Sequence, residues 1–223
     1  ASQAGDSLNL ITSDGGDNWE TLPPFVDAVT GRVGRGGNVA ISSTDPNNIV
    51  WAPANDPGLG EFAAPHVTFN GGDSWSRINT LSFSQGNFPL HHQSWNGQLL
   101  VADPLEGDTF YYYVQGFGDP SSTAVLYRST DGGTTWNIVN NTPLPSWDIA
   151  PQLMAVPGRT GELWLGSGIN QSLYHSVDGG ENWSQIAQGD EIYQVAVGSP
   201  LLGENRPTVY AYGFINGEIG RAH

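Results

Sequence analysis

One short motif occurs four times along this chain, and its spacing restricts the fold more than any other feature of the sequence. The copies begin at Thr12, Thr68, Ser129 and Ser176, and each follows the pattern Ser/Thr-x-Asp/Asn-x-Gly-x-x-Trp. The intervals between them are 56, 61 and 47 residues (12 to 68, 68 to 129, 129 to 176). A repeat of about fifty residues with a turn signal fixed inside each unit is typical of β-propeller blades. The sequence therefore predicts an all-β chain of such blades.

The chemistry of this motif, known as an Asp-box, explains why it forms a turn. Its Asp-Gly-Gly or Asn-Gly-Gly core tolerates positive φ, and the Asp or Asn oxygen accepts backbone N–H groups within the turn. The closing Trp brings an apolar surface whose burial is worth roughly 1.5–3 kcal/mol. We interpret these side chains as structural, rather than as catalytic acids or sugar-stacking platforms: Asp14, Trp19, Asn70, Trp75, Asp131, Trp136, Asp178 and Trp183.

The order of predicted strands divides residues 1–223 into a half blade, three full blades and a second half blade, within a single domain. The sequence contains 30 Gly and 15 Pro and no stretch with a sustained helical period, which agrees with an all-β fold. Two arrangements remain open for these roughly four blade equivalents. The half blades complete each other in a small closed ring, or the blades are part of a seven-bladed propeller. An open arc would expose blade edges, which predicts a homo-oligomer or further blades as partners.

The charge of the chain excludes several classes of partner. Asp and Glu number 22 against seven Lys and Arg, which gives a net charge of −15. Such acidity argues against nucleic acid and against an anionic membrane surface, and it is typical of an acidic, secreted protein. The sequence has no cysteine and no cofactor-binding fingerprint. We therefore predict no cofactor and no metal, and an extracellular location.

In a propeller, the connections opposite the Asp-boxes usually carry the ligand site. Here those connections hold aromatic and polar side chains suited to stacking on pyranose rings and to binding hydroxyl groups: Trp95, Trp147, Asp148, Asp119, His91 and His92. Glycoside hydrolysis needs two carboxyl groups at a defined separation, and Asp56 with Glu61 or Asp119 with Asp148 are candidates. The sequence does not give these separations, so no catalytic residue is assigned. Adjacent histidines point apart on an extended chain, which argues against a metal site at His91 and His92.

Beyond the Asp-boxes, the chain resembles glycoside hydrolase family 74, the xyloglucanases and related oligoxyloglucan-releasing enzymes. The resemblance covers about nine-tenths of the chain, in the order of the later part of that family's C-terminal propeller. It rests on residues 36–42 with 49–53, 101–103 with 110–112, 153–158, 161–165 and 173–180. The run from Val-Pro-Gly at 156–158 through Leu-Trp-Leu at 163–165 to Tyr-His-Ser at 174–176 is its most specific part.

The resemblance implies part of a polysaccharide hydrolase that acts on β-1,4-glucans such as xyloglucan. Members of that family place a substrate cleft between two seven-bladed propellers, and they invert the anomeric centre with one aspartate from each propeller. Neither aspartate maps onto this chain, so the resemblance predicts that the chain is inactive by itself. Two alternatives stay open from the residues alone: a non-catalytic glycan-binding propeller module, and a self-assembling structural or scaffold propeller.

Overall fold

The computed structural model describes residues 9–22, 35–54, 64–81, 97–114, 124–145, 151–166, 172–187, 191–215 and 218–221. Within these ranges the strands form five antiparallel sheets. Helices are absent from the described ranges, and the predicted all-β class is confirmed. The described part of the chain accordingly contains no helix that could cross a bilayer.

Within each sheet, neighbouring strands are consecutive in the sequence. The first sheet is a hairpin of β1 (Asn9–Ile11) and β2 (Glu20–Leu22). Three four-stranded sheets follow. The first consists of β3 (Arg35–Ile41), β4 (Ile49–Ala54), β5 (His66–Thr68) and β6 (Ser76–Arg77), and the second of β7 (Leu100–Ala102), β8 (Phe110–Val114), β9 (Val125–Ser129) and β10 (Asn137–Ile138). The third consists of β11 (Gln152–Ala155), β12 (Leu163–Gly166), β13 (Leu173–Ser176) and β14 (Ser184–Ala187).

The last sheet has three strands: β15 (Glu191–Gly198), β16 (Thr208–Ile215) and β17 (Glu218–Arg221). The sequence predicted the first two of them and ended this unit there. β17 is therefore an additional strand, which returns along β16 and pairs with residues Tyr212–Ile215.

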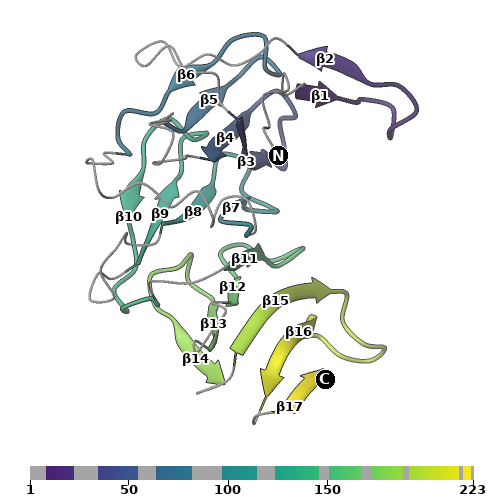
Figure 1. Ribbon diagram of the computed structural model, residues 1–223, viewed down its shortest axis with the longest axis vertical. Helices are drawn as coiled ribbons and strands as arrows, with labels where there is room; N and C mark the ends of the chain where they lie inside the picture. Colours follow the sequence, from purple (N-terminus) through teal and green to yellow (C-terminus); the bar gives the residue numbers. More distant parts are fainter. Residues whose placement is uncertain are drawn as a thin grey trace, which may run out of the picture.

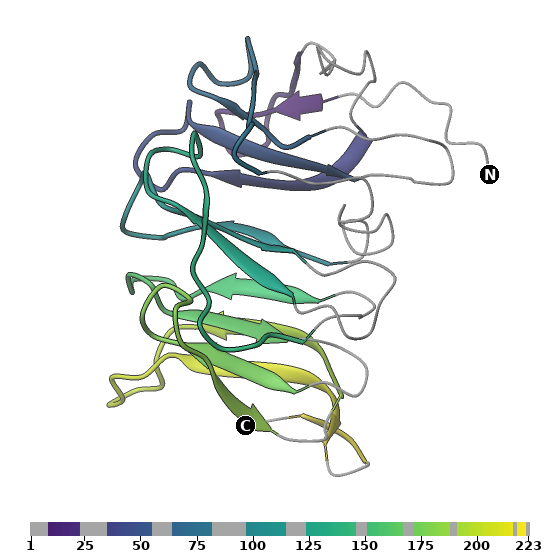
Figure 2. The same cartoon turned by 90° about the vertical axis from the view of Figure 1, so that its left-hand side faces the viewer.

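The sheets follow one another along the long axis of the molecule, as blades do (Figure 1). A view turned by 90° shows them stacked on one another (Figure 2). The first strands of successive sheets, β3, β7, β11 and β15, lie side by side. The β1–β2 hairpin and the β15–β17 sheet lie at opposite ends of this stack and form separate sheets. The described strands thus form an open arc, in which the two terminal sheets do not join into one blade.

Side-chain amides link neighbouring first strands. Asn38 on β3 donates from Nδ2 to the Gly97 carbonyl at 3.0 Å, and its Oδ1 accepts the Leu99 N–H just before β7. Gln152 on β11 accepts the Val195 N–H of β15 at 2.8 Å through Oε1. These bonds satisfy backbone groups that the blade-to-blade junction would otherwise leave unpaired.

The apolar core lies between the sheets. In the third four-stranded sheet, Leu153 and Leu165 are fully buried in the main cluster toward the preceding blade. The neighbouring residues Met154 and Trp164 pack against a second cluster, which includes Ile192 of β15. Because side chains alternate across a strand, each blade contributes one face to each of two successive interfaces.

Candidate functional site

The six side chains predicted to contact a glycan lie in connections between strands, and all of these positions are outside the described residues. The same holds for Asp56 and Glu61. Because neighbouring strands are antiparallel, the connections after β4, β6, β8 and β10 leave the sheets at the edge opposite the Asp-box turns. The positions concerned are His91, His92 and Trp95 between β6 and β7, Asp119 between β8 and β9, and Trp147 and Asp148 between β10 and β11.

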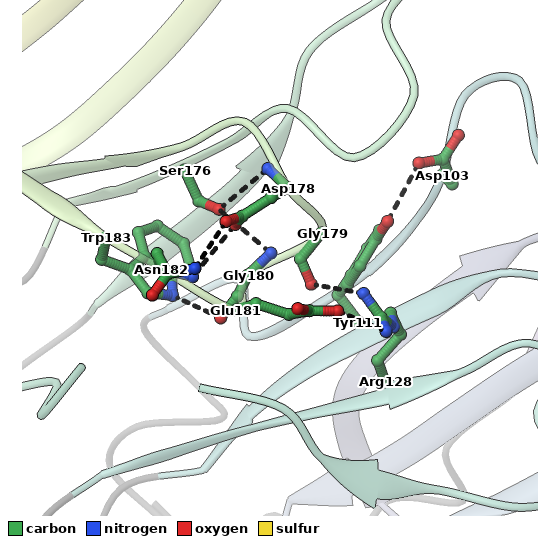
Figure 3. A network of polar contacts seen from close by, with 10 residues as sticks. All are labelled: Asp103, Tyr111, Arg128, Ser176, Asp178, Gly179, Gly180, Glu181, Asn182 and Trp183. Atoms are coloured by element: carbon green, nitrogen blue, oxygen red, sulfur yellow. Dashed lines mark hydrogen bonds and ion pairs between the residues drawn. The ribbon is translucent and has the colours of Figure 1, made fainter. Parts of the chain in front are cut away.

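The Asp-box between β13 and β14 shows the turn in detail (Figure 3). Ser176 Oγ donates to Asp178 Oδ1 at 2.9 Å and accepts the Gly180 N–H at 3.0 Å. The two carboxylate oxygens of Asp178 accept the backbone N–H and the side-chain amide of Asn182, at 3.0 and 2.8 Å. The indole N–H of Trp183 donates to the Gly180 carbonyl at 2.9 Å. Every oxygen of the Asp178 side chain is therefore occupied inside the turn.

The other three boxes repeat the hydroxyl contact of this pattern, and the third also repeats the indole bond, from Trp136 to the Gly133 carbonyl at 2.8 Å. Their first hydroxyl lies 2.8, 2.7 and 2.8 Å from the Asp or Asn oxygen, in the pairs Thr12–Asp14, Thr68–Asn70 and Ser129–Asp131. The second box has an amide in place of the carboxylate, and Asn70 donates from Nδ2 to Ser74 Oγ at 2.8 Å. The same turn thus forms with a carboxylate or with an amide.

Hydrogen bonds hold the pKa values of the three Asp-box carboxyls below their usual range. For Asp14 the largest contribution is the backbone N–H of Asn18. Partial burial acts to raise the pKa of Asp131 and Asp178, but bonds from Thr135 and Ser129, and from Asn182 and Ser176, outweigh it. A general acid for glycoside hydrolysis needs the opposite shift. These carboxylates are suited to holding turns and not to donating protons.

The fourth box is also tied to other turns of the propeller. The N–H of Gly179 donates to the Gly161 carbonyl at 2.9 Å, which joins the box to the β11–β12 turn of its own blade. From the preceding blade, Arg128 donates to the Gly179 carbonyl at 3.4 Å and forms an ion pair of 3.0 Å with Glu181 (Figure 3). The Asp-box therefore lies at a junction between two blades.

Asp103 is the carboxylate that the sequence analysis missed. It is fully buried on the turn between β7 and β8. Its Oδ1 accepts the N–H groups of Leu105 and Glu106 at 3.0 and 2.9 Å. Its Oδ2 accepts the Tyr111 hydroxyl at 3.1 Å and, from the next blade, the Gly161 N–H at 2.8 Å. Burial, followed by the charge of Asp103, raises the pKa of Tyr111.

Four donors on one enclosed carboxylate identify Asp103 as a structural group, because neither oxygen is left for a substrate. One sequence signal pointed to its turn: Asp103 precedes Pro104, in a stretch that also carries the family resemblance. Aspartate is common at such positions because it accepts N–H groups two and three residues ahead. The contact with Gly161 had no signal in the sequence.

A second polar cluster joins the β11–β12 turn, which carries Arg159 and Glu162, to Trp164 on β12 and His175 on β13. Glu162 Oε1 is 3.0 Å from His175 Nε2, and Glu162 Oε2 is 3.4 Å from Arg159 Nε. The ring of Trp164 stacks on His175 with centroids 4.1 Å apart. Glu162 therefore has a partner for each oxygen. Across the described ranges, no three His, Asp or Glu side chains are grouped to hold a metal ion.

Curated relatives match the chain over almost its full length. A xyloglucanase of Paenibacillus sp is 28% identical over 214 residues, covering 94% of this chain and 18% of the relative. A xyloglucanase of Acetivibrio thermocellus is 28% identical over 207 residues, covering 93% of this chain and 20% of the relative. The chain thus spans about a fifth of the length of the curated relatives it matches.

No protein-family model matches the chain. Among solved structures, a family 74 glycoside hydrolase from Niastella koreensis aligns with a TM-score of 0.69 at 19% identity, over 95% of this chain and 26% of that chain. This agreement confirms the predicted β-propeller fold. Together with the xyloglucanase relatives, it confirms the resemblance to glycoside hydrolase family 74 that the motifs and strand sequences indicated.

Proposed function

We propose that the chain is part of a secreted hydrolase that cleaves the β-1,4-glucan backbone of xyloglucan, to which it contributes propeller blades beside the substrate. The observation that carries the proposal is the 28% identity to a xyloglucanase, which extends over 94% of this chain. An extracellular location belongs to the same proposal, because a polymeric glycan is accessible to an enzyme outside the cell.

The role of this part would be to bind and position the glycan. Six candidate residues belong, by their position in the sequence, to connections that leave the strands opposite the Asp-box turns: Trp95, Trp147, Asp148, Asp119, His91 and His92. Aromatic faces stack on sugar rings, and carboxylate and imidazole groups bind hydroxyls. Such contacts favour a polysaccharide as the partner.

Hydrolysis by this chain alone is not expected. Inverting hydrolysis needs one carboxyl group that protonates the leaving oxygen and a second that activates water. Asp103 has four donors and no exposed surface, and Asp131 and Asp178 are held in turns. Glu162 is paired with His175 and Arg159. None of these four described carboxylates is free to fill either role.

Two measurements on the same sample test the proposal. Release of reducing sugar from xyloglucan should be absent, whereas xyloglucan should retard the protein in an affinity gel. Trp95→Ala and Trp147→Ala should each weaken this retardation, and Ile138→Asp, on the outer strand β10, should not. Sugar release by the purified chain would contradict its inactivity, and equal mobility with and without xyloglucan would contradict glycan binding.

A non-catalytic glycan-binding module is the second candidate. It is supported by the same set of aromatic and polar positions, together with the structural use of Asp103, Asp131, Asp178 and Glu162. The two candidates differ in glycan range. A part of a xyloglucan hydrolase should bind xyloglucan more tightly than unbranched β-1,4-glucan, and a general module should bind both alike.

A further inference from the structure

The second Asp-box, residues 68–75, combines a side-chain amide with a following glycine, in the pair Asn70-Gly71. The other three boxes carry aspartate at the same position, as Asp14, Asp131 and Asp178. Glycine has no Cβ, so its backbone nitrogen meets little steric hindrance when it approaches the side-chain carbonyl carbon of the residue before it. In an unfolded chain, attack by this nitrogen releases the asparagine amide as ammonia.

The folded box fixes the side chain of Asn70. Its Oδ1 accepts the Thr68 hydroxyl at 2.7 Å and the Ser74 N–H at 3.0 Å, and its Nδ2 donates to Ser74 Oγ at 2.8 Å. The residue is exposed, so water has access to it. The hydrogen bonds, and not burial, therefore decide whether the amide is free to turn toward the Gly71 nitrogen.

The attacking nitrogen is held as well. The Gly71 N–H donates to the Asn47 carbonyl at 3.0 Å, which ties the box to the turn between β3 and β4. The N–H groups on either side of it, of Asn70 and Gly72, donate to Thr68 Oγ1 at 3.2 and 3.1 Å. For the Gly71 nitrogen to bond to Asn70 Cγ, it must give up its proton and leave its acceptor. The closed box opposes both changes.

We propose that Asn70 is a modification site of this protein and that opening of the second Asp-box controls its rate. In the open box the Gly71 nitrogen forms a bond to Cγ of Asn70 and gives up its proton to the departing amide nitrogen. The Cγ–Nδ2 bond breaks and ammonia leaves. Water then opens the cyclic imide at one of its two carbonyl groups, which gives aspartate or isoaspartate. The new carboxyl group ionises, and its proton converts the ammonia to ammonium.

The two products fit the turn differently. Aspartate keeps the backbone and the side-chain length of asparagine, and the third box shows how the same turn accepts it. There Asp131 accepts the Thr135 N–H at 2.9 Å and the Thr135 hydroxyl at 2.6 Å. Isoaspartate adds a methylene group to the main chain and shortens the side chain by one carbon. It therefore loses the bond to the Ser74 N–H or the bond from Gly71 to Asn47. Aspartate lets the box close again, and isoaspartate keeps it open.

Ageing of the purified chain in mildly alkaline buffer, with and without denaturing urea, tests the control by the fold. Peptide mass spectrometry follows the mass gain at each Asn-Gly pair. In urea, Asn70 should react about as fast as Asn96 and Asn216, which also precede glycine. In the folded chain, Asn70 should react about 30-fold or more slowly, because a reaction through an open form is limited by the population of that form. Equal rates at Asn70 in the two conditions would contradict the proposal.

Two matched hydroxyl deletions separate opening of this box from unfolding of the whole chain. Thr68→Ala removes the group that bonds to Asn70 Oδ1 and to two N–H groups, and should speed the reaction of the folded chain by about 10-fold. Ser129→Ala removes the equivalent hydroxyl of the third box and should leave the rate at Asn70 as in wild type. Equal acceleration by both variants would show that Asn70 reacts only from the unfolded chain, which contradicts control by the box.

A milder variant covers the case in which Thr68→Ala does not fold, as judged by near-ultraviolet circular dichroism. Ser74→Ala, at an exposed position, removes the acceptor of Asn70 Nδ2 and should speed the reaction several-fold. An unchanged rate in this folded variant would also contradict the proposal.

The stability of the two products is tested in an Asn96→Gln, Asn216→Gln background, where Asn70 is the one remaining asparagine followed by glycine. The chain is aged in urea and refolded, the two products are separated by chromatography, and electron-transfer fragmentation identifies each. The aspartate product should unfold at the same urea concentration as recombinant Asn70→Asp in this background, and the isoaspartate product at a lower one. Equal midpoints for the two products would contradict their different fit to the turn. These measurements involve no glycan, so their outcome is independent of the proposed function.

Discussion

The carboxylate of Asp103 accepts a 2.8 Å hydrogen bond from the backbone N–H of Gly161, which belongs to the following blade. The same oxygen accepts the Tyr111 hydroxyl of its own blade. Bonds to a charged acceptor are stronger than neutral ones, and burial strengthens them further. This side chain therefore couples two blades whose backbone strands belong to different sheets.

Replacing Asp103 with asparagine should destabilise the protein. The amide nitrogen of the asparagine would face at least one N–H or O–H donor and could not accept from it. A buried donor left without an acceptor lowers the free energy of unfolding by roughly 1–3 kcal/mol, and by more where the lost acceptor was charged. Urea unfolding of the variant and of wild type measures the difference in the free energy of unfolding. Asp108→Asn is the control, because this exposed residue of the same turn should change stability by no more than about 0.5 kcal/mol. Equal effects at the two sites would contradict a special role for Asp103.

In the second, third and fourth Asp-boxes, the second glycine packs against the preceding sheet. A Cβ on Gly180, where φ is +85°, would lie 2.0 Å from Leu126 Cδ2. Gly16 has the same place in the first box and a φ of +102°, but its nearest atom would be Trp19 Cζ2 at 3.9 Å. Gly16→Ala should cost roughly 1–2 kcal/mol from backbone strain alone. Gly180→Ala should cost about 1–3 kcal/mol more because of overpacking. Similar unfolding midpoints for both variants would show that Leu126 moves aside freely.

The Asp-box tryptophans should differ in their contribution to stability. Trp183 is 7% exposed and donates to the Gly180 carbonyl, whereas Trp19 is 59% exposed. Trp183→Ala should lower the free energy of unfolding by about 3–5 kcal/mol. Trp19→Ala should have a much smaller effect, within about 1 kcal/mol. A comparable loss at Trp19 would mean that this side chain is covered in solution.

Local chemistry explains why so much of the fold could be predicted. The Asp-box turns depend on residues within five positions of one another, such as Ser176 and Gly180. Strand propensity is local as well: β8, Phe110–Val114, consists of four aromatic residues and a valine, which are typical of strands. Turn chemistry and propensity are both readable along the chain.

Contacts between blades were not predictable in the same way. The bonds from Asn38 to Gly97 and from Asp103 to Gly161 join residues 59 and 58 positions apart. No local pattern specifies which backbone groups will lie opposite such a side chain. β17 was missed for a related reason, since its four residues, Glu-Ile-Gly-Arg, pair only because β16 extends to Ile215. The six positions proposed to bind glycan fall outside the described residues, and their grouping stays a prediction.

Acid should weaken the fold through the Asp-boxes, and asparagine should remove that sensitivity. Because the folded pKa of Asp131 is depressed, its contribution to stability is fully present above the unfolded value near pH 4 and is lost as the pH falls through the folded pKa. Asn70 already supports the same turn, with Nδ2 donating to Ser74 Oγ. In the third box Thr135 Oγ1 lies against the Asp131 carboxylate and is placed to accept from an amide there in the same way. Asp131→Asn should therefore be folded at neutral pH.

The free energy of unfolding of Asp131→Asn should decline less below about pH 4 than that of wild type, by up to about 1 kcal/mol after allowance for solvent screening. The reciprocal change, Asn70→Asp, should steepen the decline, since its carboxylate would accept the Thr68 hydroxyl and the Ser74 N–H as the amide oxygen does. Urea unfolding measured at successive pH values compares the three proteins. Parallel profiles would show that these carboxylates are no better stabilised in the folded chain than in the unfolded one.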